Sequence, residues 1–309
     1  MNHTEKYSLL ALFEALRPAQ WIKNLNLFAS AILNGQLFNP VVFVQSVLAT
    51  ISFCLLSSSS YLVNDIVDVE KDRHHPYKKN RPIARGDVPI PLAIFTAVAL
   101  TFVGLSFAVV VNSGFFLLAV IFIVLQYFYS FVLKKKAIMD IIGIAFFFIL
   151  RAFAGVTATG YHLPIWIMLT VIFLSLFIAS GKRRSELVKT GTKTRSSLEG
   201  YGRNLLNFYT TMFAVCTLIT YSMFTFFEEQ VHFQGYLQQF FLDNFPGAID
   251  RKWYMITILP VIFGIMRYGQ IIFEMQEGER PERIIATDIP LLISVVTWGL
   301  LMIGIVYVF

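Results

Sequence analysis

Long apolar runs alternate with short polar connections along almost the whole chain. Nine runs are candidates for membrane-spanning helices: 21–36, 41–65, 90–111, 114–132, 138–158, 164–181, 204–227, 253–273 and 287–308. Apart from the first, which is short, they hold about 18–25 residues, enough to cross a hydrocarbon core about 30 Å thick at 1.5 Å per residue. This pattern predicts an all-α polytopic membrane protein with about nine transmembrane helices, in one integral membrane domain that covers residues 1–309.

The composition also indicates a membrane protein. Of the 309 residues, 56% are hydrophobic and only 14% are charged, whereas about 25% of the residues of a soluble domain are charged. Residues 1–20 contain four charged residues and no continuous apolar core, so we expect a cytoplasmic N-terminal segment rather than a signal peptide. Cys54 and Cys216 lie in apolar runs, which favours buried thiols over a disulfide.

The basic residues predict how the chain is oriented. If the N-terminus is cytoplasmic and the nine runs alternate in direction, nearly all Lys and Arg residues fall on the cytoplasmic side, and only Arg251 and Lys252 fall opposite. Positively charged loops are retained in the cytoplasm during insertion. We therefore expect a cytoplasmic N-terminus and a C-terminus on the opposite side. The net charge of +6 lies in short loops tied to helix ends, so it does not indicate a nucleic-acid partner.

The most polar stretch begins at the end of the second apolar run. Asp65, Asp68 and Asp72 follow the spacing i, i+3 and i+7, and Asn64 lies four residues before Asp68. On a helix that continued from the second run, these side chains would share one face. Oxygen ligands with open positions suit Mg²⁺, which keeps waters and shares its coordination with substrate phosphates. The alternative is a solvated helix end, where acidic residues are ordinary.

A stiff basic loop follows the carboxylates directly. It contains His75, Pro76, Lys78, Arg81 and Pro82. Lys and Arg bind phosphate oxygens of the kind that also bridge to a metal. Carboxylate, metal, phosphate and cation together stabilise a departing diphosphate. We therefore expect a polar cavity that faces the cytoplasm, with connection 66–89 as one wall.

Several motifs together resemble the UbiA superfamily of intramembrane prenyltransferases. The N-D-x-x-D-x-x-x-D pattern from Asn64 to Asp72 is the superfamily signature. The stretches "LRPAQWIKN" (16–24), "YSFVLKKKAIMD" (129–140), "LRAFAG" (150–155), "SGKRRSEL" (180–187) and "SLEGY" (197–201) resemble the branch that transfers a phosphoribosyl group to a polyprenyl phosphate. The H-P-x-K sequence that begins at His75 narrows the match to the same branch. This resemblance implies an enzyme in the bacterial cytoplasmic (inner) membrane.

The connection expected at 182–203 departs from ordinary prenyltransferases, which carry a second aspartate-rich motif there. Here it holds Glu186 and a run of cations: Lys182, Arg183, Arg184, Lys189, Lys193 and Arg195. Replacing carboxylates by cations implies fewer metal ions and more phosphate to neutralise, as phosphoribosyl diphosphate would require. Membrane anchoring by positive charge is the alternative reading, and it applies first to Lys189, Lys193 and Arg195.

The resemblance implies a reaction and a set of site residues. Polyprenyl phosphate would attack the anomeric carbon of phosphoribosyl diphosphate, and diphosphate would leave; an ionised phosphate needs no general base. Mg²⁺ would be held by Asn64, Asp65, Asp68 and Asp72. Donor phosphates would meet Lys78, Arg81, Lys134, Lys182 and Arg183, and the lipid phosphate would meet Gln20 and Lys23. Tyr129, Arg151 and Glu186 complete the expected substrate-binding set. For Arg151, which lies inside a span, pairing with a carboxylate and lining the cavity remain equal alternatives.

Two other functions are compatible with parts of the sequence. A prenyltransferase acting on an aromatic acceptor would share the first motif, but the missing second aspartate pair argues against it. A non-enzymatic transporter would place polar residues or broken helices at the membrane midplane, where Arg151 is the one strong candidate. The sequence leaves open the isoprenoid length and the oligomeric state, a homo-oligomer included.

Overall fold

The computed structural model describes residues 9–74, 78–191, 196–228, 235–245, 247, 251–278 and 281–308, and within these ranges every regular element is a helix. The α-helices are α1 (Leu9–Ala15), α2 (Ala29–Leu33), α3 (Pro40–Val67), α4 (Val69–Arg73), α5 (Pro82–Arg85), α6 (Ile90–Val111), α7 (Ser113–Phe131), α8 (Met139–Thr159), α9 (Ile165–Thr190), α10 (Arg203–Phe227), α11 (Gly235–Asn244), α12 (Ile258–Gln270), α13 (Pro281–Thr287) and α14 (Ile289–Ile303). Short 3-10 or π segments are η1 (Pro18–Phe28), η2 (Lys78–Asn80), η3 (Leu133–Lys135), η5 (Ser196–Gly200), η7 (Trp253–Thr257), η8 (Ile271–Met275) and η9 (Gly304–Val308).

Eight helices in the described part of the chain are long and apolar enough to cross a membrane. They correspond to eight of the nine predicted runs. The ninth, predicted at 21–36, consists of the 3-10 helix η1 and the short helix α2. This segment still runs the length of the bundle, because Arg17 at its start contacts Asp65 at the end of α3 and Asn34 at its end donates to the His162 carbonyl beyond α8.

The bundle is packed closely where helices must pass each other. Gly155 on α8 lies against the Leu27 backbone of η1, and Gly104 on α6 lies against Leu56 on α3, so neither position has room for a larger side chain. Small residues allow this approach, which drives helix association in lipid. A core of apolar residues on α3, α7 and α8 includes Phe53 and Phe122, both without exposed surface.

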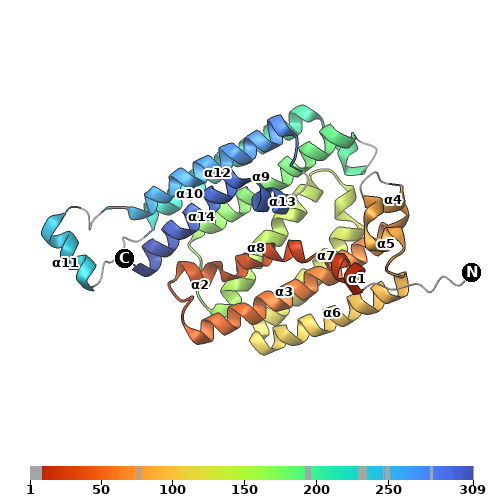
Figure 1. Ribbon diagram of the computed structural model, residues 1–309, viewed down its shortest axis with the longest axis horizontal. Helices are drawn as coiled ribbons and strands as arrows, with labels where there is room; N and C mark the ends of the chain where they lie inside the picture. The colour runs from red at the N-terminus through yellow and green to blue at the C-terminus, as the bar shows by residue number, and fades with distance from the viewer. Residues whose placement is uncertain are drawn as a thin grey trace, which may run out of the picture.

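Two groups of helices form the bundle, as Figure 1 shows. One contains α3, α6, α7 and α8, and the other contains α9, α10, α12 and α14. The short helices α4 and α5 follow α3 at one end of the bundle, which is also where α1 lies (Figure 1). The described N-terminal residues therefore begin at this end, which we call the polar end.

One predicted boundary was wrong in a way that affects the site. The sixth run was expected to end at residue 181, but α9 continues to Thr190. Residues 182–190 contain no Gly or Pro, and the first Gly is Gly191, which has a positive φ of 65° and follows the last helical residue. Glycine is the residue that most readily ends a helix in this way. Lys182 and Glu186 thus lie on a helix rather than in a loop.

Candidate active site

A cavity of about 1110 Å³ opens at the polar end of the bundle. Its wall comes from α1, η1, α3, α4, η2, α7, η3, α8, α9 and α13, and it is rich in charged side chains. Of the fourteen predicted site residues, thirteen line it: Gln20, Lys23, Asn64, Asp68, Asp72, Lys78, Arg81, Tyr129, Lys134, Arg151, Lys182, Arg183 and Glu186. The fourteenth, Asp65, does not appear among the lining residues. Segments far apart in the sequence therefore converge on one polar space.

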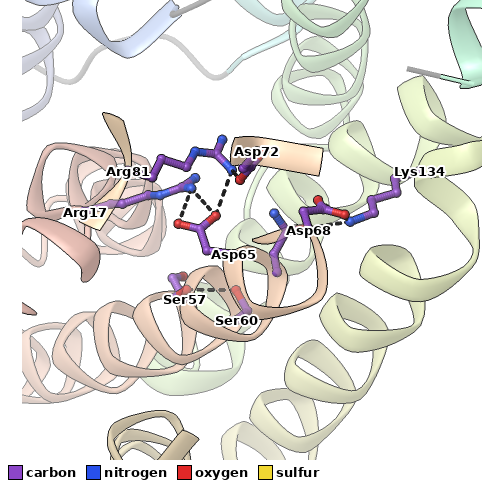
Figure 2. A network of polar contacts seen from close by, with 9 residues as sticks. Arg17, Ser57, Ser60, Asp65, Asp68, Asp72, Arg81 and Lys134 are labelled. Atoms are coloured by element: carbon purple, nitrogen blue, oxygen red, sulfur yellow. Dashed lines mark hydrogen bonds and ion pairs between the residues drawn. The ribbon is translucent and has the colours of Figure 1, made fainter. Parts of the chain in front are cut away.

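Asp65 is held by two arginines, as Figure 2 shows. Arg17 Nη2 lies 2.5 Å from Asp65 Oδ1 and 2.7 Å from Oδ2. Arg81 Nη1 donates to Asp65 Oδ1 at 2.9 Å and to Asp72 Oδ2 at 2.5 Å. Both carboxylates are buried, with side chains 3% and 5% exposed. This burial excludes the solvated helix end as an account of these two residues.

Asp68 points in a different direction. It accepts from Lys134 Nζ at 2.6 Å, and the same nitrogen donates to Asn64 Oδ1 at 2.9 Å. Figure 2 shows Asp68 turned toward Lys134 and away from the two arginines. The expected single face was therefore wrong: α3 ends at Val67, Asp68 lies between helices with φ −96° and ψ 4°, and α4 starts anew at Val69. This break directs Asp65 and Asp68 to different partners.

The electrostatics of Asp72 follow from this arrangement. Burial raises the pKa of the Asp72 carboxyl above its ordinary value, Arg81 opposes that rise, and the neighbouring Asp65 adds to it. Burial disfavours the charged form of a carboxyl, and a like charge nearby does the same. A further cation bound near Asp72 would lower this pKa, as Arg81 already does in part.

A second polar network joins α8, α9 and the segment that precedes α10. Asp140, at the start of α8, has no exposed surface and accepts from Tyr201 Oη at 2.6 Å and Ser197 Oγ at 3.1 Å. Arg183 Nε lies 2.7 Å from Asp140 Oδ2, and the Arg183 guanidinium also pairs with Glu186. Arg183 is 1% exposed although it lines the cavity. Two carboxylates thus surround one guanidinium here.

Tyr201 also ties this network to the loop before α8. Its hydroxyl accepts from the Ile138 backbone N–H at 2.5 Å while donating to Asp140. Burial and the Asp140 carboxylate raise the pKa of Tyr201 well above its usual range. The hydroxyl therefore stays protonated and keeps both hydrogen bonds at any physiological pH.

Arg151 contacts no carboxylate within the described part of the chain. Its Nε donates to Asn24 Oδ1 at 2.7 Å and its Nη1 to the Phe147 carbonyl at 2.9 Å. Its guanidinium carbon lies 5.0 Å from the centre of the Phe122 ring, a cation–π distance. Since Arg151 also lines the cavity, the geometry favours the second of the two sequence-based alternatives.

The remaining predicted residues divide into cavity and structural positions. Gln20 accepts from Lys23, both on η1 and both on the cavity wall. Arg184 is structural: its Nη1 donates to the Ile272 carbonyl at 2.6 Å. Lys189 is exposed and outside the cavity. His75, Pro76, Lys193 and Arg195 lie outside the described residues.

Sequence reasoning missed four residues of this region: Arg17, Asp140, Tyr201 and Arg283. Arg17 and Arg283 line the cavity, and Asp140 and Tyr201 hold Arg183. Arg17, Asp140 and Tyr201 lie in motifs that were recognised, but nothing in the spacing connects positions so far apart. The structure adds that Arg17 has a φ of 55°, a left-handed conformation that a non-glycine residue rarely adopts, directly before Pro18.

Comparison with known proteins identifies the family of this bundle. The model of the "UbiA prenyltransferase family" matches residues 26–234. The chain belongs to the UbiA prenyltransferase family. The family assignment agrees with the helical fold, the position of the N-D-x-x-D-x-x-x-D sequence and the polar cavity next to it.

Several UbiA family proteins are similar over nearly the full chain. "Decaprenyl-phosphate phosphoribosyltransferase" of Corynebacterium glutamicum is 35% identical over 96% of this chain and 87% of that protein. The Mycolicibacterium smegmatis protein of the same name is 36% identical over 93% of this chain and 89% of its own length. Among solved structures, a UbiA homolog from Archaeoglobus fulgidus bound to GPP and Mg²⁺ has a TM-score of 0.71 at 19% identity and covers 96% of this chain and 99% of that one. This last likeness concerns the fold.

Proposed function

We propose that this protein transfers a 5-phosphoribosyl group from phosphoribosyl diphosphate to a polyprenyl phosphate and releases diphosphate. The observation that carries the proposal is the convergence of cations from η1, η2, η3 and α9 on a single cavity that is also lined by Asp68 and Asp72. A substrate pair with four phosphate groups needs such a cavity. Relatives named decaprenyl-phosphate phosphoribosyltransferase, at 35–36% identity, support the same reaction.

The reaction requires positioning and charge neutralisation. A phosphate oxygen of the lipid forms a bond to C1 of the ribose while the bond from C1 to the diphosphate oxygen breaks, and the electron pair leaves with the diphosphate. The nucleophile is already ionised, so the protein supplies no base. Lys78 and Arg81 bind the leaving diphosphate, and Lys134 and Lys182 meet the remaining phosphates, while Arg183 pairs with Asp140 and Glu186. Holding both reactants and stabilising the leaving charge are the main sources of rate.

The donor set around Asp68 fits a divalent metal ion. Its members are oxygens, and Mg²⁺ is commonly held by one or two carboxylates together with substrate phosphates. The described residues contain no group of three or more His, Cys, Asp or Glu able to hold an ion alone, so the diphosphate would complete the coordination. Asn64, Asp68 and Asp72 would hold Mg²⁺, with Asp65 behind them as a fourth candidate. The ion would neutralise charge on the departing diphosphate.

The acceptor would enter from the membrane. Gln20 and Lys23 lie on η1, where the neighbouring Ile22 and Leu25 are 47% and 57% exposed. A polar pair beside exposed apolar residues suits a phosphate that carries a long hydrocarbon chain. The soluble donor must come from the aqueous side, and the basic loops support an orientation in which the polar end faces the cytoplasm from a bacterial inner membrane.

The test is a direct transfer assay. Membranes containing the protein are incubated with ribose-labelled phosphoribosyl diphosphate, Mg²⁺ and decaprenyl phosphate, and the label is extracted into organic solvent. We expect label in the lipid phase that depends on the protein and on both substrates. A second assay supplies geranylgeranyl diphosphate and an aromatic acid, the substrate pair of the alternative prenyltransferase reaction. Transfer to the aromatic acid without transfer to the lipid phosphate would refute the proposal.

A further inference from the structure

Glu186 is the one acidic residue among the three that α9 contributes to the cavity wall, the other two being the cations Lys182 and Arg183. It lies on α9 one helical turn after Lys182, and both line the cavity. Residues four apart project from the same helix face. A carboxylate in this position repels phosphate but can accept hydrogen bonds from a ligand group that donates them.

The Glu186 side chain is held in place by Arg183. It is 12% exposed and pairs with Arg183, which in turn contacts the fully buried Asp140. Tyr201 and Ser197 donate to Asp140 and hold it in place. Because one guanidinium faces two carboxylates, this group keeps a net negative charge, and Arg183 has less positive charge to offer to a phosphate than its position in the sequence suggested.

The donor contains one kind of group that a fixed carboxylate recognises. A carboxylate accepts hydrogen bonds and cannot donate them, and the only hydrogen-bond donors of ionised phosphoribosyl diphosphate are the 2- and 3-hydroxyls of its ribose. Acidic side chains recognise ribose hydroxyls in nucleotide-binding proteins by the same chemistry. A polyprenyl chain offers no such donor.

We infer that Glu186 accepts hydrogen bonds from the ribose hydroxyls of the donor while Lys182 binds its 5-phosphate. The two residues are separated by about 6 Å along the axis of α9, a spacing comparable to that between the phosphate and ring hydroxyls of one ribose 5-phosphate. This inference rests on the proposed function and adds to it a residue that selects a sugar donor. The rival role for Glu186 is that of a metal ligand.

The experiment compares two stable sugar phosphates as competitors of the donor. Purified protein in detergent is assayed for lipid transfer in the presence of ribose 5-phosphate or 2-deoxyribose 5-phosphate. We expect wild-type protein to bind ribose 5-phosphate about tenfold to a hundredfold more tightly, since a hydrogen bond to a charged group contributes that much. In Glu186→Gln this ratio should fall toward one. Glu199→Gln, the same change at an exposed position outside the cavity, should keep the wild-type ratio.

The dependence of activity on Mg²⁺ distinguishes the inferred role of Glu186 from the rival role as a metal ligand. If Glu186→Gln keeps the ratio and raises the Mg²⁺ concentration needed for half-maximal activity, Glu186 is a metal ligand and the inference is wrong. An unchanged ratio together with unchanged Mg²⁺ dependence also overturns it. Should Glu186→Gln unfold, Glu186→Asp keeps the charge but withdraws the carboxylate by one methylene, and it should reduce the ratio as well; an unchanged ratio in that variant counts against the inference.

Failure of the inference and failure of the proposed function give different results. Wild-type protein that makes a phosphoribosyl lipid but does not distinguish the two competitors refutes only the role of Glu186. Wild-type protein that makes no phosphoribosyl lipid refutes the proposed function itself.

Discussion

Arg17 Nη2 donates to both carboxylate oxygens of Asp65, at 2.5 and 2.7 Å, across 48 residues of sequence. The contact joins the N-terminal segment to the end of α3. It also supplies Asp65 with a cation besides Arg81, so that Arg81 is shared between Asp65 and Asp72 rather than held by one of them. Arg17 and Arg81 thus share the task of neutralising the buried Asp65 carboxylate.

Arg17→Ala should destabilise the protein measurably. It removes one of the two cations that contact the buried carboxylate of Asp65, and losing a charged partner of a buried group costs about 1–3 kcal/mol. Thermal unfolding in detergent measures the effect. Arg73→Ala, which removes an exposed pair with Glu70, should cost at most about 1 kcal/mol. Equal losses in the two variants would contradict the role given to Arg17.

Asp68→Asn and Asp72→Asn should each abolish transfer while the protein still inserts and folds. Each change removes a negative charge proposed to hold Mg²⁺ against the diphosphate. The transfer assay and a chelator titration measure this. Asp87→Asn serves as the matched control, because Asp87 pairs with Arg85 outside the cavity. Activity that survives both substitutions, or that resists chelation, would remove the metal from the mechanism.

Lys182→Ala should weaken donor use by about tenfold to a hundredfold in kcat/KM, the usual value of one charge-assisted contact. Discrimination against ribose 1-diphosphate, which lacks the 5-phosphate, should shrink by the same factor. Lys189→Ala removes the same charge from an exposed position on the same helix and should leave both quantities unchanged. If the two variants behave alike, α9 binds no donor phosphate through Lys182.

Asp288 gives a prediction about pH and stability. The hydrogen bond from Arg267 holds the pKa of Asp288 below its ordinary value. A lowered folded-state pKa means that the stabilisation is complete above the ordinary value of 3.8 and is lost as the pH falls through the folded value. Asp288→Asn keeps a side chain able to cap α14 but loses the charge. The difference in unfolding temperature between wild type and variant should narrow on acidification below 3.8, and a constant difference would contradict the charge effect.

Single cysteines test the orientation. Lys79→Cys and Asp243→Cys replace exposed residues on η2 and α11, which lie on opposite sides according to the predicted topology. A membrane-impermeant thiol reagent should label position 79 only from the cytoplasm and position 243 only from outside. The native Cys54 and Cys216 lie within spans and should stay unlabelled. Labelling of 79 and 243 from the same side would contradict the placement of the active site.

The helical bundle was predictable because each span is defined by its own sequence. An apolar run near 20 residues long has one solution in a bilayer, whatever its neighbours are. The carboxylates and the basic loop were predictable for a related reason, since Asn64 to Arg81 form one continuous polar stretch. A local sequence therefore sufficed to locate the polar end.

The partners within the site were not predictable from spacing. Asp68 meets Lys134 and Asp140 meets Arg183 only because α3, η3, α8 and α9 pack side by side. Arg183 was assigned to phosphate from its sequence context, but the structure surrounds it with carboxylates. Which side of a helix a charged residue uses depends on tertiary contacts, and these contacts join residues far apart in the chain.

The 3-10 conformation of η1 determines both how far this segment extends along the bundle and which of its side chains lie in the same row. At about 2.0 Å per residue, its 11 residues extend about 22 Å, whereas the same length of α-helix would extend about 16 Å. A repeat of three also aligns every third side chain. Asn24 and Leu27 form a buried row, Gln20 and Lys23 a polar row on the cavity, and Ile22 and Leu25 an exposed apolar row whose Ile22 also borders the cavity. A short segment thereby brings a polar row and an exposed apolar row together at the cavity, while its third row packs into the protein core.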